Sequence, residues 1–254
     1  IASLKKLRIK NQESRIRGDG KNKTKDSLHI KIEDPEDCPR YTARIMTGIS
    51  SGQSPVWMRD RLASCGIQSI NNLVDAANYV MLETGQPLHV FDYDRIKSQE
   101  SRIKTLFVRR ARMGERMEGL DGKTYALNPD ILVIADEQEP IAIAGIKGGK
   151  SSGVSDDTHT IIIESANFDP IGIRRASQVL GLRTDASVRF EHGLDPNQTL
   201  AAADRLAQII REIAGGEILG SACDTYPKKE KRMRIIFHPD YAERLIGAAI
   251  PASF

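Results

Sequence analysis

The sequence is poor in cysteine, in aromatic residues and in long apolar runs. Its 254 residues include three cysteines, one tryptophan and 5% aromatic side chains. Cys38, Cys65 and Cys223 are widely spaced and form no CxxC pair, which argues against a disulfide framework and suits a reducing cytoplasm. No apolar run approaches the ~20 residues that a membrane-spanning helix needs. We therefore expect a cytoplasmic protein without a membrane partner.

The rest of the composition is that of a folded, soluble chain with an uneven charge. Hydrophobic residues make up 40% and charged residues 28%, and the length allows one large domain or two small ones with a real core. Residues 1–27 hold nine Lys and Arg against three Asp and Glu, whereas the whole chain holds 37 against 34. The first 27 residues therefore carry +6, and residues 28–254 carry −3.

The two ends differ from the body of the chain. Residues 1–27 form a basic arm that could touch nucleic acid, although a solvated tail is the commoner outcome for such a segment. The chain starts at Ile1 and not at a methionine, and we expect it to be a piece of a longer protein. Residues 227–232, PKKEKR, have the composition of a charged linker.

Strand and helix signals occur in separate blocks along the chain. Apolar and alternating runs predict strands, and N-capping residues followed by terminal glycines predict helices. Asp121-Gly122 is a strong hairpin signal. This order predicts an α+β fold with mixed sheet in the middle of the sequence and helices on either side. The predicted strands are 28–34, 41–49, 104–109, 131–135, 141–144, 159–163 and 217–226, and the predicted helices start at Ser54, near Asn71 or Asn72, at Asp169 and at Asp195.

The stretch from Ile141 to Glu164 is the best candidate for a binding site. An apolar strand runs into Gly145, Gly148 and Gly149, and a second apolar strand ends at Glu164. Glycine lets a backbone approach a ligand closely and present its N–H groups. A pocket is one interpretation, and two core strands joined by a flexible loop are the other. This stretch alone does not decide between them.

Glu164 follows three isoleucines, and a carboxylate there is expensive to bury without partners. It either pairs with an arginine, such as Arg174 or Arg189, or faces a pocket. Known catalytic loops do not account for this region. The glycines lack the GK[ST] ending of a phosphate-binding loop, and no serine lies in a GxSxG elbow.

The segment HVFDYD contains His89, Asp92 and Asp94 and invites a metal-site interpretation. On an extended chain, however, His89 and Asp92 face opposite sides, and we predict no metal site. His89 is then either a polar group or proton carrier of a pocket, or a histidine that bonds its own loop. Asn78, on the flank of a predicted apolar helix face, carries an amide that needs hydrogen-bond partners.

A charged segment, Gly181 to Pro196, lies between two predicted helices. It is either a salt-bridged connector, or it lines the same pocket or meets a polyanion through Arg183 and Arg189. Composition does not separate these interpretations.

Four long stretches together resemble a known family. In order and spacing they match the B3/B4 module of the bacterial phenylalanyl-tRNA synthetase β subunit, over roughly residues 28–226, and agreement of several motifs at once makes the resemblance specific. The basic arm, residues 1–27, resembles the tail of the preceding tRNA-binding (OB) modules. FHPDYAERLIG resembles the opening of the following B5 module, so residues 227–254 are interpreted as a linker and its truncated start. The four stretches are CPRYTARIMTGI, SPVWMRDRLASCGIQSINNLVDAANYVMLETGQPLHVFDYD, AIAGIKGGKSSGVSDDTHTIIIESANFDP and LGLRTDASVRFEHGLDP.

The resemblance implies a three-layer β/β/α editing module. Such a module hydrolyses the ester of tyrosine wrongly attached to tRNA(Phe), whereas aminoacylation belongs to the catalytic α subunit of an α2β2 enzyme. The implied partners are tRNA(Phe) and that α subunit. The resemblance implies no cofactor in this chain, and ATP and Mg²⁺ for the whole synthetase.

The resemblance also implies residue roles. Glu164 and the Gly148 backbone would read the tyrosine hydroxyl. Lys147 stands where many relatives carry an apolar residue, so its side chain should point away from the substrate or tolerate variation. The implied catalytic residues are His89 and Asn78, and the implied substrate-binding residues are Ala144, Gly145, Gly148 and Glu164.

Two other functions remain open at this stage. One is a non-catalytic tRNA-binding or subunit-packing module with an inert pocket. The net negative body argues mildly against strong autonomous RNA binding, because phosphate contacts need Lys and Arg. The other is a metal hydrolase built on HVFDYD.

Overall fold

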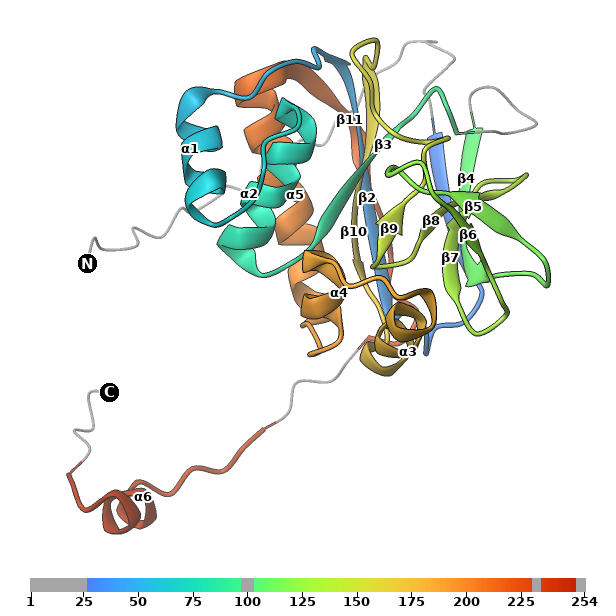
Figure 1. Cartoon of the computed structure of the whole chain (residues 1–254). Helices are drawn as coiled ribbons and strands as arrows, with labels where there is room; N and C mark the ends of the chain where they lie inside the picture. Colours follow the sequence, from blue (N-terminus) through green and yellow to red (C-terminus); the bar gives the residue numbers. More distant parts are fainter. Residues whose placement is uncertain (1–26, 97–102, 230–233, 250–254) are drawn as a thin grey trace, which may run out of the picture.

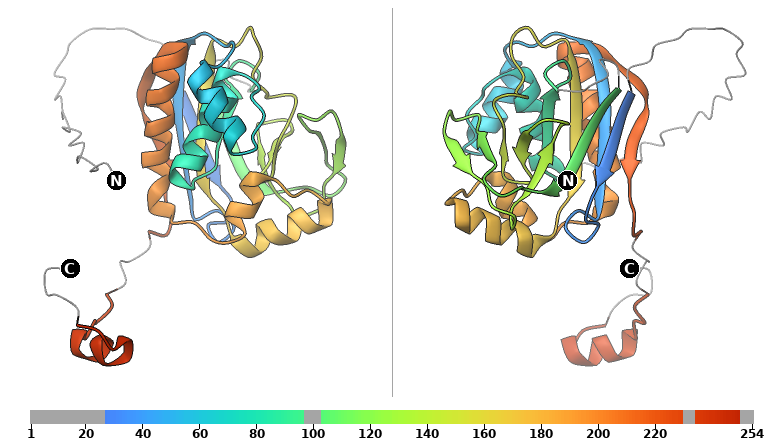
Figure 2. Two further views of the ribbon diagram at one scale, coloured as in Figure 1. Left: turned by 60° about the vertical axis from the view of Figure 1, so that its left-hand side comes forward. Right: turned by 90° about the vertical axis from the view of Figure 1, so that its right-hand side faces the viewer.

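The computed structural model describes residues 27–96, 103–229 and 234–249, which form three layers and a separate helix (Figure 1). Helices cover one face of a four-stranded sheet, and a five-stranded sheet lies on its other side (Figure 2). The α+β class and the β/β/α layering are thereby confirmed. The basic arm lies outside the described residues except for Ser27.

The four-stranded sheet is antiparallel and has the order β11-β2-β10-β3. Its strand β10 continues for three residues beyond Glu164 and pairs there with β2. The prediction that this strand ends at Glu164 is therefore wrong, and the carboxyl group lies in the middle of a strand. The bounds are β2 (Arg40–Ile49), β3 (Leu88–Asp92), β10 (Thr160–Asn167) and β11 (Gly215–Thr225).

The five-stranded sheet has the order β1-β4-β7-β8-β9 and is mixed, because β1 and β4 run parallel and the other pairs antiparallel. The hairpin β5–β6 turns at Asp121-Gly122 as predicted, with Gly122 at φ 75°. The bounds are β1 (Ser27–Ile32), β4 (Ile103–Arg110), β5 (Arg116–Glu118), β6 (Thr124–Ala126), β7 (Leu132–Ala135), β8 (Pro140–Ile143) and β9 (Lys147–Gly148).

The glycine-rich stretch is divided between these two sheets. Strand β8 turns back through Gly145 into the short strand β9, so both belong to the five-stranded sheet, whereas β10 belongs to the other sheet. The two apolar strands of the sequence are thus not neighbours in one sheet. They face each other from different layers, which leaves space between them for a cavity.

The helical layer consists of α1 (Val56–Ser64), α2 (Asn72–Thr84) and α5 (Thr199–Ala214). Of the two predicted starts of α2, Asn71 and Asn72, Asn71 is the cap, because its side chain accepts hydrogen bonds from the N–H groups of Leu73 and Val74. Ser54 does not cap α1, because its hydroxyl donates to the buried carboxylate of Asp75. Two short helices that follow β10 in sequence, α3 (Pro170–Leu180) and α4 (Asp185–Phe190), lie together at one end of the sheets (Figure 1). The helix α6 (Pro239–Ile246) lies apart and has no buried residue.

The alternation of side chains along β10 places Glu164 between the two sheets. Ile161 and Ile163 pack in the cluster that joins the sheet to the helices, whereas Ile162 and Ala166 pack in the cluster between the sheets. Since side chains alternate along a strand, Glu164 shares the face of Ile162 and Ala166. The Glu164 side chain therefore points toward the five-stranded sheet and can line a cavity only on that side of β10.

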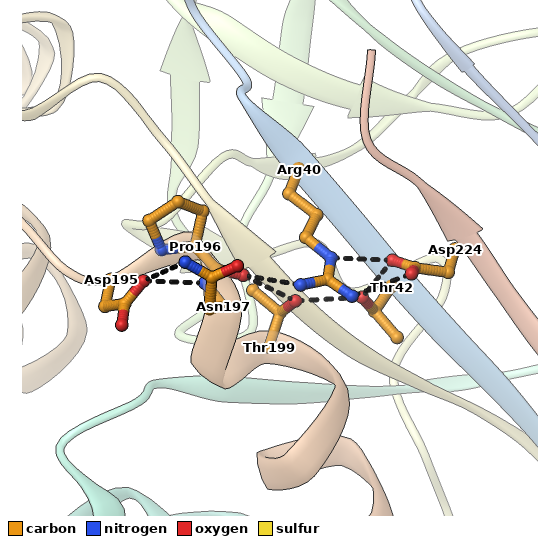
Figure 3. Close-up of polar contacts among 7 residues, drawn as sticks. All are labelled: Arg40, Thr42, Asp195, Pro196, Asn197, Thr199 and Asp224. Atoms are coloured by element: carbon orange, nitrogen blue, oxygen red, sulfur yellow. Dashed lines mark hydrogen bonds and ion pairs between the residues drawn. The ribbon is translucent and has the colours of Figure 1, made fainter. Parts of the chain in front are cut away.

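A polar network fixes the edge of the four-stranded sheet to the helical layer (Figure 3). The guanidinium of Arg40 on β2 donates to both oxygens of Asp224 on β11, at 2.8 and 2.7 Å, and to the carbonyl of Pro196 at 3.0 Å. Thr42 donates to Asp224 at 2.8 Å, and its hydroxyl lies 3.0 Å from that of Thr199. The network joins two strands to the 3₁₀ turn η1 (Pro196–Gln198) at the start of α5.

Candidate functional site

A small cavity of about 70 Å³ lies between the two sheets. By the measure in which one water needs ~10–15 Å³, it has room for several water molecules. Strand β3, the β8–β9 turn, Glu164 of β10 and the end of α4 contribute to its wall. The lining residues are Pro87, Leu88, His89, Ile134, Ala142, Ile143, Gly145, Ile146, Lys147, Gly148, Glu164 and Phe190.

Glu164 and His89 are directly opposite each other on neighbouring antiparallel strands, β10 and β3. Opposite residues of such strands point to the same face, with their side chains close together. The His89 ring packs edge-on against Phe91, with centroids 4.5 Å apart. The sheet register therefore brings the two titratable groups to one wall of the cavity.

Glu164 is buried, with 6% of its surface exposed. Burial raises its pKa to about 8, and the nearby Tyr41 hydroxyl lowers this pKa only in part. No arginine forms an ion pair with Glu164 within the described residues; Arg189 instead pairs with Asp185 at 3.3 Å, and Arg174 is exposed. The carboxyl group is consequently protonated near neutral pH and faces the cavity instead of an arginine.

His89 is also uncharged near neutral pH. Burial lowers its pKa to about 4, because a desolvated imidazole resists protonation. Its Nε2 atom is buried and has no hydrogen-bond partner in the described structure. A neutral imidazole of this kind is a weak base, and it is suited to orienting a water or an ester by hydrogen bonding.

Two buried polar atoms of residues that line the cavity have no hydrogen-bond partner among the described residues. They are Glu164 Oε2 and His89 Nε2. Leaving a buried polar group unpaired costs about 1–3 kcal/mol, so groups of this kind are normally satisfied by protein, water or ligand. Because Glu164 and His89 lie opposite each other on the same wall of the cavity, the two atoms indicate a site for a ligand with polar atoms.

The glycines of the β8–β9 turn are required by close contacts. Gly145 has φ 66°, and a Cβ there would lie 2.9 Å from the ring of Phe190 and 3.1 Å from that of Phe168. A Cβ on Gly148 would lie 2.6 Å from His89 Cε1. Any larger residue at Gly148 must therefore displace the imidazole.

The structure brings together four of the six residues predicted for the site. His89, Gly145, Gly148 and Glu164 all line the cavity. Ala144 is adjacent but buried in the core, and Asn78 is half-buried on α2, and neither is among the lining residues.

Sequence reasoning missed Tyr41 and Phe190. Tyr41 is fully buried on β2, and alternation along β2 puts it on the same face as Ala43, the residue opposite Glu164. The alternation along β2 can be seen in the sequence, but the sequence does not tell which neighbouring residues lie on the same face as Tyr41. Phe190 ends α4, the helix formed by the charged segment, and Thr184 ties this helix to the turn by donating to the carbonyl of Ile146 at 3.1 Å.

The charged and acidic segments show local pairing. Arg183 lies 3.4 Å from Glu191, in agreement with the salt-bridged connector, although the same segment also supplies Phe190 to the cavity. In HVFDYD, Asp92 accepts a hydrogen bond from Thr158 at 2.6 Å. Across the described ranges, no three His, Cys, Asp or Glu side chains come close enough to hold a metal ion.

Sequence comparison places the chain in a family. The B3/4 domain family matches it over residues 37–215. The chain belongs to this family. Among its relatives are the phenylalanine–tRNA ligase β subunits of Thermotoga maritima, 42% identical over 221 residues, and of Symbiobacterium thermophilum, 45% identical over 220 residues.

The B3/4 chain covers only part of these relatives. Each alignment includes 87% of this chain but 27% or 24% of the relative, so the chain spans about a quarter of their length. A crystal structure of an N-terminal fragment of the phenylalanyl-tRNA synthetase β subunit from Pyrococcus horikoshii has the same fold. It matches with a TM-score of 0.50 and 14% identity, over 93% of this chain and 64% of that one.

Within the described ranges, every helix is too short or too polar to span a membrane.

Proposed function

We propose that this B3/4 domain is the editing module of a phenylalanine–tRNA ligase β subunit and hydrolyses the ester of mischarged Tyr-tRNA(Phe). The observation that carries the proposal is the protonated Glu164 carboxyl group on the wall of a small cavity, with its Oε2 atom lacking a hydrogen-bond partner among the described residues. The names of the relatives support the same assignment.

Selection would depend on the hydroxyl group that distinguishes tyrosine from phenylalanine. A neutral carboxyl group both donates and accepts, so Glu164 can hydrogen-bond a phenol without burying a charge. The Gly148 backbone would supply a second polar contact, while Ala144 and Gly145 leave room for the ring. Phenylalanine in the same cavity leaves the buried groups unpaired, and a site of this type discriminates by up to ~10⁴–10⁵.

Hydrolysis needs a positioned water more than a strong base, because an aminoacyl ester is already activated. The water oxygen attacks the ester carbonyl, the acyl C–O bond breaks, and the ribose hydroxyl leaves with a proton, which gives tyrosine and free tRNA(Phe). His89 Nε2, which lacks a partner in the described structure, would orient the water or the ester. Asn78 would orient the ester from α2, and a terminal ribose hydroxyl of the tRNA would assist.

The domain would act within a larger enzyme. Its partners would be tRNA(Phe) and the catalytic α subunit of an α2β2 ligase in the cytoplasm. ATP and Mg²⁺ would serve aminoacylation in that whole enzyme, and this domain would need no cofactor of its own.

The test is deacylation of Tyr-tRNA(Phe) and Phe-tRNA(Phe) by the complete α2β2 ligase that contains this chain, and by the chain alone. We expect the ligase to hydrolyse Tyr-tRNA(Phe) far faster than Phe-tRNA(Phe), and a zinc-selective chelator to leave that rate unchanged. Hydrolysis of neither substrate would overturn the proposal and leave a non-catalytic tRNA-binding or subunit-packing module. Loss of activity with the chelator would favour a metal hydrolase.

A further inference from the structure

Lys147 is the only positively charged residue among the described residues that line the cavity. Its backbone belongs to β9, opposite Ile143 of β8. Its ammonium group lies 3.3 Å from Asp121 Oδ2, and its side chain is 24% exposed. Asp121 does not line the cavity, so the charge of Lys147 lies at the border and not within it.

The β5–β6 hairpin that carries Asp121 is fastened to the same glycine turn. The N–H of Leu120 donates to the carbonyl of Gly148 at 3.1 Å, and Gly119 forms an isolated bridge with Gly149. The Leu120 side chain lies 3.0 Å from the position of a Cβ on Gly148, the same position that His89 Cε1 approaches to 2.6 Å. The hairpin tip, the lysine and the cavity wall therefore meet at Gly148.

Asp121 has other partners that hold it in place. It accepts a hydrogen bond from the Tyr125 hydroxyl at 2.7 Å and another from the N–H of Lys123 at 3.3 Å. The Lys147 contact is long for a charge-assisted hydrogen bond, which normally measures about 2.7–2.9 Å. Exposed pairs of this kind add little stability. Lys147 can thus leave Asp121 for another anion while Asp121 stays bonded.

We propose that Lys147 binds the 3′-terminal phosphodiester of an aminoacylated RNA whose amino-acid side chain occupies the cavity. This inference rests on the proposed function. With the tyrosine hydroxyl at Glu164, the small cavity holds little more than the side chain, so the ester and terminal nucleotide lie at its border. The phosphodiester is the nearest anion to the ester in such a substrate, and lysine binds phosphate as a mobile point charge.

The test compares K147M and K147R with K150M in the complete ligase. Lys150 is a matched control, because it lies three residues further on, is exposed, pairs with Glu118 at 2.7 Å and does not line the cavity. Two substrates are used: Tyr-tRNA(Phe), and 3′-O-tyrosyl-adenosine, which has the ester but no phosphate. Thermal unfolding of each variant verifies that the fold is intact.

We expect K147M to lower kcat/KM for Tyr-tRNA(Phe) by about tenfold, the size expected for one charge-assisted hydrogen bond, mainly through KM, and to leave hydrolysis of tyrosyl-adenosine unchanged. The slope of log(kcat/KM) against log[salt] should become shallower by about 0.7, the value for one phosphate contact to a single strand. K147R and K150M should behave as the unmodified enzyme.

Equal losses on both substrates, or equal effects of K147M and K150M, would overturn the role of Lys147 and leave the editing function standing. Failure of the unmodified enzyme to hydrolyse either substrate would instead reject the proposed function, and this inference with it.

Discussion

Glu164 and His89 face each other across neighbouring strands, and both are uncharged between about pH 4 and pH 8. Burial produces both shifts, since it raises the pKa of an acid and lowers that of a base. The result is a cavity wall that is polar without being charged. A wall of this kind suits a neutral phenol better than an ion.

The first prediction concerns stability between pH 6.5 and pH 8. Glu164 has a folded-state pKa of about 8 against an ordinary value of 4.5, so its stabilising effect is complete below pH 4.5 and is lost as pH rises through 8. His89 opposes this trend only below its ordinary value of 6.5. Between pH 6.5 and 8, the free energy of unfolding should fall by about 2 kcal/mol. Denaturant titrations of the unmodified protein and of E164Q measure this, and E164Q should lack the decline.

A second prediction concerns Tyr41, whose buried hydroxyl forms no hydrogen bond of normal geometry in the described structure but lies near the Glu164 carboxyl group and lowers its pKa. Tyr41→Phe removes this hydroxyl and retains the ring, so stability should be unchanged or should rise by up to ~1 kcal/mol at pH 6.5. Because the hydroxyl lowers the pKa of Glu164, the decline in stability should move to higher pH in the variant. A marked loss of stability would contradict this prediction and show that the hydroxyl is well hydrogen-bonded in the folded protein.

A third prediction uses the contact between Gly148 and His89. A Cβ at Gly148 would lie 2.6 Å from His89 Cε1, so Gly148→Ala must displace the ring without disturbing backbone atoms. Hydrolysis of Tyr-tRNA(Phe) should fall by roughly 10²-fold, as catalysis does when positioned groups move by about 1 Å. Gly52→Ala is the matched control, because a Cβ there meets nothing within 4 Å. Full activity of the Gly148 variant would remove His89 from the mechanism.

A fourth prediction concerns the network around Arg40 and Asp224. Asp224→Ala leaves the Arg40 guanidinium with the Pro196 carbonyl as its only hydrogen-bond acceptor among the described residues, beside its contact with the Tyr226 ring, and removes one acceptor of Thr42. The variant should lose about 1–3 kcal/mol of stability at neutral pH, measured by urea denaturation. Since Arg40 lowers the pKa of Asp224, its contribution is present above the ordinary pKa of the carboxyl group and is lost as pH falls through the lowered value. The variant and the unmodified protein should converge in acid.

Sequence patterns predicted the elements well where the signals are local. The Asn71 cap, the Asp121-Gly122 turn and the apolar run before Glu164 depend on residues a few positions apart, and the structure contains all three. The prediction that Ser54 caps a helix is wrong, because the Ser54 hydroxyl bonds Asp75, 21 positions away. A contact of this kind is absent from a local pattern.

The geometry of the site was less accessible from the sequence. The two strands flanking the glycines belong to different sheets, and strand pairing is decided by contacts distant in sequence. The position of Tyr41 near Glu164 can be inferred from the alternation of side chains only when the register of β2 against β10 is known. The raised pKa of Glu164 depends on its burial between the two sheets, so it cannot be predicted from the residues around Glu164 in the sequence.

Discrimination between Tyr-tRNA(Phe) and Phe-tRNA(Phe) by a Glu164→Ala variant of the complete ligase tests the central claim most directly. The ratio of the two kcat/KM values for hydrolysis should fall by at least about fivefold, because phenylalanine no longer leaves a buried carboxyl group unpaired, a difference of ~1–3 kcal/mol. Glu164→Gln, which keeps a donor and an acceptor, should retain most of the preference. An unchanged ratio in Glu164→Ala, with hydrolysis intact, would contradict the account.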